Sequence, residues 1–221
     1  MKLYTGMGPN PRVVTIAVSE TGANVELVTV DLVAGENRAE EHLARNPAGQ
    51  LPTLELADGH CVSEITAIAE YLDDVTAASR GASIIGSTPE ERAETHMWVR
   101  RIDLNICENM ANGFRFAEGL PLFEGRLHVI PQAADDLKKV ARDWLAKLDG
   151  LIGDREFICG DRFTLADILL FGFLEFGGSV GQPLDPKCER LQGGAFDRGD
   201  DEVCHCGKVR LGGLSRRGLL E

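Results

Sequence analysis

The order of strands and helices in the first 80 residues narrows the possible folds of this chain more than any other feature. Residues 2–5 are predicted to form a strand, residues 11–21 a helix ended by Gly22, and residues 25–30 a second strand. Two strands joined by one helix over so short a span form a parallel pair with a right-handed crossover. We therefore expect the chain to open with a small β-α-β unit.

The next segment predicts a mixed four-stranded sheet. Residues 35–46 hold a polar stretch and a short helix. Residues 53–56 and 60–62 are predicted strands, and the Asp-Gly pair between them is a hairpin signal. Residues 64–77 space their apolar side chains as one face of a helix. We thus expect an α/β domain over residues 1–78.

The rest of the chain predicts a second, all-helical domain. Residues 79–88 are small and polar, as in an interdomain linker. No strand-like alternation follows, and helices are predicted over 89–117, over 131–151 and from Thr164 onward. The first and third begin with capping boxes, formed by Thr88 with Glu91 and by Thr164 with Asp167. We place this all-α domain at residues 89–186.

Charge and cysteine usage exclude several functional classes. The net charge of −12 leaves no basic surface to neutralise nucleic-acid phosphates or anionic lipids. No stretch approaches the roughly 18 apolar residues of a membrane helix, and the start lacks the pattern of a signal peptide. The 6 cysteines are scattered without a CxxC pair. We expect a cytoplasmic protein with reduced thiols, without nucleic-acid or membrane partners.

Three motifs carry a resemblance to a known family. They are NPAGQLPTL at residues 46–54, VSEITAIAEYL at residues 62–72, and GDRFTLAD at residues 160–167. In order and spacing they resemble the glutathione S-transferase family over residues 1 to 186. The resemblance implies a thioredoxin-like N-terminal domain, an all-α C-terminal domain and a homodimer. It also implies a detoxifying transferase that moves the sulfur of glutathione, a co-substrate, to a small hydrophobic electrophile.

The resemblance implies where glutathione binds. Leu51 and Pro52 would be joined by a cis peptide bond that turns the Leu51 backbone toward the cysteinyl unit, like an added strand. Glu64 and Ile65 stand at a predicted helix N-terminus, which favours the γ-glutamyl carboxylate. The family usually has Ser or Thr where this chain has Ile65, so a hydroxyl donor worth about 0.5–1.5 kcal/mol is missing. Either Ser63 or Thr66 could replace it.

Other candidate residues rest on the same resemblance. Asn37, Arg38 and Gln50 occupy positions where relatives bind the glycyl end. The family's serine position after the first strand is Gly8 here, so Asn10 becomes the candidate donor to the glutathione sulfur. We expect the Asn10 carbonyl oxygen to cap the helix while its amide donates to sulfur.

Alternatives remain for the thiol donor and for the function. Thr5 is the other candidate donor, whereas Tyr4 is expected in the core. Without a usual hydroxyl donor, the protein could be a non-catalytic binder of glutathione or of a hydrophobic ligand. Thiol–disulfide exchange is disfavoured because no cysteine lies near residue 10.

The C-terminal residues depart from the family pattern. Residues 187–221 are rich in glycine and cysteine and show little helical period, so we expect an atypical tail whose composition favours disorder. Cys204, His205 and Cys206 are spaced too tightly for a usual structural zinc site, and no metal is predicted.

Overall fold

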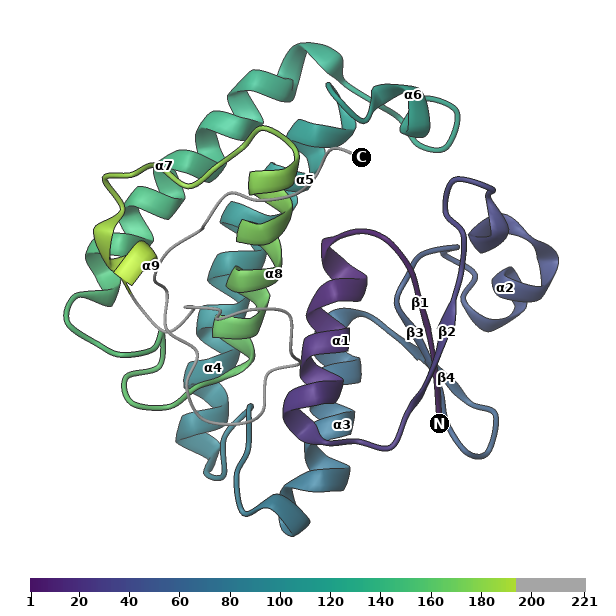
Figure 1. Ribbon diagram of the computed structural model, residues 1–221, viewed down its shortest axis with the longest axis horizontal. Helices are drawn as coiled ribbons and strands as arrows, with labels where there is room; N and C mark the ends of the chain where they lie inside the picture. Colours follow the sequence, from purple (N-terminus) through teal and green to yellow (C-terminus); the bar gives the residue numbers. More distant parts are fainter. Residues whose placement is uncertain (194–221) are drawn as a thin grey trace, which may run out of the picture.

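The computed structural model describes residues 1–193 and contains the two expected layers of structure, a small mixed sheet and a helical bundle (Figure 1). The N-terminal elements are β1 (Lys2–Thr5), α1 (Pro9–Thr21), β2 (Glu26–Thr29), η1 (Glu36–Arg38), α2 (Glu40–Arg45), β3 (Thr53–Glu55), β4 (Cys61–Ser63) and α3 (Ile65–Arg80). The strand order is β2-β1-β3-β4, with β1 parallel to β2 and the other pairs antiparallel. In Figure 1, α1 and α3 cover one face of the sheet, whereas α2 lies on its other side. The thioredoxin-like arrangement is therefore confirmed.

The helical domain is built around α4, α5, α7 and α8. Its elements are α4 (Pro89–Ile102), the π-helical segment η2 (Asp103–Cys107), α5 (Glu108–Arg115), α6 (Leu120–Phe123), η3 (Pro131–Ala133), α7 (Ala134–Ile152), α8 (Leu165–Ser179) and α9 (Glu189–Gly193). The single helix expected over 89–117 is thus interrupted by a π-helical turn. Such turns shift the side chains that follow them and often occur at functional sites.

Two predicted capping boxes are confirmed and fix the starts of α4 and α8. In the second, the Thr164 N–H donates to the Asp167 carboxylate at 2.8 Å. The same carboxylate accepts the Ile158 N–H at 2.9 Å, which ties the preceding loop to α8. Burial raises the pKa of Asp167 to about 6 although these hydrogen bonds oppose the shift.

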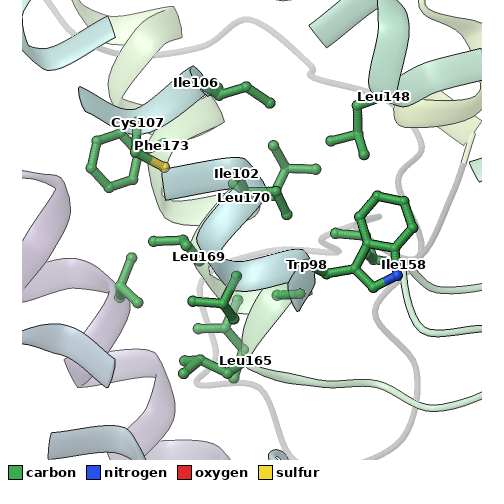
Figure 2. Packing of buried hydrophobic residues seen from close by; sticks show 14 of the residues in the cluster. Trp98, Ile102, Ile106, Cys107, Leu148, Ile158, Leu165, Leu169, Leu170 and Phe173 are labelled. Carbon is green, nitrogen blue, oxygen red and sulfur yellow. The ribbon is translucent and has the colours of Figure 1, made fainter. Parts of the chain in front are cut away.

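One hydrophobic core joins the two domains. Figure 2 shows side chains of α4 and α8, among them Trp98, Ile102 and Leu169, packed in this cluster. Val13 and Ala17 of α1 belong to the same cluster. Where α1 meets α8, a Cβ on Gly172 would lie 2.6 Å from the Val13 side chain, so glycine permits this close contact. The interface between α1 and α8 is consequently well packed.

The start of α1 corrects one expectation. The helix begins at Pro9, with Gly8 at the N-cap position and no side-chain cap, so Asn10 does not cap it. Gly8 has a φ of 115°, which a residue with a side chain rarely adopts. Both Pro9 and Pro11 could occupy the first helical position, where proline is favoured. The conformation of Gly8 makes Pro9 the first residue of the helix.

The helical domain continues past the expected boundary at residue 186. Cys188 and Leu191 are buried, and the Leu191 N–H donates to the buried Asp149 carboxylate at 2.8 Å. The Cys-His-Cys group at residues 204–206 lies outside the described residues. Within residues 1–193, no helix is both long and apolar enough to cross a membrane.

Candidate functional site

A cleft of about 130 Å³ lies where the sheet domain meets α4 and α8. It is lined by Asn10, Asn46, Gln50, Leu51, Pro52, Ser63, Glu64, Ile65, Thr66, Val99, Asp103, Glu108, Leu165 and Leu169. The segments before β3 and after β4 contribute most of the polar side of this lining. The cleft therefore brings together six of the eight residues expected at the site.

The backbone of Leu51 offers unpaired hydrogen-bonding groups to this cleft. The Leu51–Pro52 bond is cis, as expected. Neither the N–H nor the C=O of Leu51 makes a hydrogen bond within residues 1–193. Because buried or half-buried peptide groups are normally paired, these two are available to an extended peptide ligand.

Glu64 joins β4 to α3 in an uncommon conformation. Its φ of 75° and ψ of 132° fall where residues with side chains are rarely found. The first-turn N–H groups of Ile65 and Thr66 have no acceptor within the helix and point out of its N-terminus. Ser63 and Thr66, the two possible replacements for the missing hydroxyl, both line the cleft. This corner can therefore hold an anion.

Asn10 reaches the cleft from the first turn of α1. Its side-chain amide makes no hydrogen bond to any other described residue, so its donors are available to a ligand. Of the other donors considered, Tyr4 is buried, as expected, and its hydroxyl donates to Glu55 at 2.7 Å. Thr5 belongs to β1 and does not line the cleft.

Two expected residues lie away from the cleft. Asn37 is buried, and its amide donates to the Gly49 carbonyl at 2.6 Å. Arg38 extends toward the carbonyl of Arg126, 3.5 Å away, on the loop after α6. Asn37 therefore holds the backbone of the loop, and Arg38 connects the domains at the surface.

Sequence reasoning named no residue of the wall that the helical domain supplies to the cleft. Asp103 begins the π-helical segment η2, Glu108 directly follows it, and both residues line the cleft. Burial, and then the charges of Glu108 and Glu64, raise the pKa of Asp103. Val99, Leu165 and Leu169 form the apolar part of the wall; the two leucines are labelled in Figure 2. The site is thus acidic on one side and apolar on another.

No group of three or more metal-ligating side chains occurs among the residues that the structure describes.

Comparisons with known proteins agree on one family. Residues 1–74 match the glutathione S-transferase N-terminal domain, and residues 131–176 match the C-terminal domain. Glutathione S-transferase 2 of Saccharomyces cerevisiae is 31% identical over 190 residues, covering 85% of this chain and 80% of that protein. Elongation factor 1-gamma of Homo sapiens is 33% identical over 156 residues, covering 69% of this chain but 33% of that protein.

A solved structure gives the same result. The crystal structure of a glutathione S-transferase domain-containing protein from Marinobacter aquaeolei VT8 superposes with a TM-score of 0.80 at 35% identity. The match covers 86% of this chain and 93% of that one, so it includes both domains.

Proposed function

Because this chain belongs to the glutathione S-transferase family and has a glutathione S-transferase-like function, we propose that its cleft binds reduced glutathione and transfers the sulfur to a small hydrophobic electrophile. The observation that carries the proposal is the pair of unpaired groups on Leu51 beside the helix N-terminus at Glu64. The first suits the extended cysteinyl unit, and the second suits the charged γ-glutamyl end.

The γ-glutamyl end carries an ammonium and a carboxylate, and the corner at Glu64 offers partners for both. The N–H groups of Ile65 and Thr66 would hold the carboxylate. The carboxylates of Glu64 and Asp103, close enough for one to raise the pKa of the other, would accept the ammonium. Binding a cation there would relieve the repulsion between the two acids.

The glutathione thiolate needs a hydrogen-bond donor in the cleft more than it needs a general base. Lowering a thiol pKa from about 8.5 by two units requires about 2.7 kcal/mol of thiolate stabilisation. One or two hydrogen bonds to a charged acceptor, at about 1.5–3 kcal/mol each, supply this. We assign that donation to the Asn10 amide, which is free and lines the cleft. The thiol proton leaves to water, and the sulfur attacks the electrophile while the leaving group departs with its electron pair.

The electrophile would lie against the apolar wall of Val99, Leu165 and Leu169. These side chains belong to the core of the helical domain, so the wall is rigid and matches a hydrophobic substrate better than a charged one. A role in detoxification and a cytoplasmic location complete the proposal, because the cytosol is where glutathione keeps thiols reduced.

We also propose a homodimer formed by the faces of α3 and α4. Val75 of α3, Met97 of α4 and Leu104 of the adjoining segment η2 are exposed although they are apolar, as expected of a surface covered by a second copy. Sedimentation at several concentrations should give twice the mass of the chain; a monomer at micromolar concentration would contradict this assembly.

A paired assay tests the proposed activity against its alternative. Retention on immobilised glutathione measures binding, and conjugation of glutathione to a chloronitrobenzene measures turnover. The proposal predicts both, and predicts that Asn10→Ala keeps retention but loses most turnover. Retention without turnover in the parent protein would favour a non-catalytic binder, which the absence of a hydroxyl at Gly8 motivates.

A further inference from the structure

Four buried polar side chains converge on two consecutive carbonyl groups just before Leu51. Asn37, His42, Asn46 and Thr53 are each at most 5% exposed. Asn37 holds the Gly49 carbonyl, as described above. The other three surround the Gln50 carbonyl oxygen: His42 Nε2 at 3.1 Å, Asn46 Nδ2 at 3.0 Å and Thr53 Oγ1 at 3.4 Å. Together these hydrogen bonds hold the loop before Leu51 in one conformation.

The direction of the Gln50 carbonyl determines the direction of the Leu51 amide. A trans peptide unit is planar, and its C=O and N–H point to opposite sides. The Gln50–Leu51 bond is trans, since Leu51–Pro52 is the cis bond of the described chain. With the Gln50 oxygen drawn inward, the Leu51 N–H must point outward, on the side where Leu51 lines the cleft.

His42 contacts the Gln50 carbonyl without lining the cleft. It lies on α2, does not line the cleft, and packs its ring edgewise on Tyr4, with centroids 6.3 Å apart. A carbonyl oxygen only accepts hydrogen bonds, so Nε2 carries the proton. Nδ1 is buried and has no partner within residues 1–193. Within residues 1–193, the imidazole ring of His42 thus makes one hydrogen bond, from Nε2 to the Gln50 carbonyl.

We propose that His42 is a positioning residue of the glutathione site: its Nε2–H holds the Gln50 carbonyl inward and thereby presents the Leu51 N–H to the peptide ligand. The inference rests on the proposed function, because it names the residue that orients a group used there. Asn46 also holds the Gln50 carbonyl, but it lines the cleft as well. A substitution at His42 therefore tests the orientation of the Leu51 N–H without changing a residue that lines the cleft.

Two substitutions test this role in the full-length protein. His42→Phe keeps a ring against Tyr4 but removes the donor, whereas His42→Gln keeps an N–H at a similar reach. Calorimetry with reduced glutathione should show Kd raised about 3- to 10-fold in His42→Phe and restored to within about twofold of the parent in His42→Gln. The KM for glutathione should rise in parallel, with kcat and the KM for the electrophile unchanged.

A remote variant controls for general loss of stability. Ile152→Val lies in the helical core and should lower the melting temperature without changing Kd. If His42→Phe binds as tightly as the parent, or if His42→Gln fails to rescue it, His42 does not position Leu51. Equal loss of binding in Ile152→Val would also overturn the role. If the parent itself binds no glutathione, the proposed function fails first.

Discussion

Replacing Glu64 with glycine should make the protein more stable and weaken its binding of glutathione. The backbone of Glu64 adopts φ 75° and ψ 132°, a conformation that costs a residue with a side chain about 1–3 kcal/mol. Glycine removes this cost but adds about 0.5–1 kcal/mol of conformational freedom to the unfolded chain. The side chain is exposed and makes no hydrogen bond or ion pair with another described residue. The net expectation is a gain of about 0.5–2 kcal/mol in the free energy of unfolding.

Glu64→Gln is the matched control, because it removes the charge beside Asp103 and keeps the strained backbone. Urea denaturation of both variants isolates the backbone effect, and calorimetry with reduced glutathione measures binding. Both should bind about 10- to 100-fold more weakly, since a charge-assisted contact worth about 1.5–3 kcal/mol is lost. If Glu64→Gly is no more stable than Glu64→Gln, the strain argument is wrong. Unchanged affinity in both would remove Glu64 from the site.

Three further outcomes follow from buried and coupled acids. Asp73 is buried and accepts from Arg80 at 2.6 Å and from the Ile84 N–H at 2.9 Å, so Asp73→Ala should lower the free energy of unfolding by about 3–5 kcal/mol in urea denaturation. A loss near zero would mean that the connection after α3 does not depend on it. The raised pKa of Asp167, about 6, means that the native state holds a proton which the unfolded state releases. The stability of the parent relative to Asp167→Asn should therefore be greatest below pH 4 and fall by about 3 kcal/mol as pH rises from about 4 to above 6. A difference that does not change with pH would contradict this. Glu108→Gln should lower the pKa of Asp103, because the Glu108 charge helps to raise it. Carbon NMR of the Asp103 carboxyl measures this pKa. An unchanged pKa would show that the two acids are not coupled.

Local signals in the sequence located most of the fold. The capping residues Thr88 and Thr164 predicted the starts of α4 and α8, because a capping box is formed by residues three apart in the sequence. The start of α1 was misplaced because Pro9 and Pro11 suit the same helical position, and only the conformation of Gly8 decides between them.

The site was predicted less completely, for reasons of distance along the chain. Leu51, Pro52 and Glu64 belong to local motifs and line the cleft as expected. Asp103 was missed because a π-helical turn depends on tertiary packing and leaves no clear pattern in the sequence. Asn37 was expected at the ligand, but the Gly49 carbonyl, 12 residues away, occupies its amide.

We propose that the Leu51 backbone and the N-terminus of α3 together bind a γ-linked tripeptide. The most direct test of this proposal is a titration of the full-length, 15N-labelled protein with reduced glutathione, followed at each backbone amide. We expect saturable shifts that are largest at Leu51, Ile65 and Thr66. Saturable shifts centred on other residues, or none at millimolar glutathione, would contradict it.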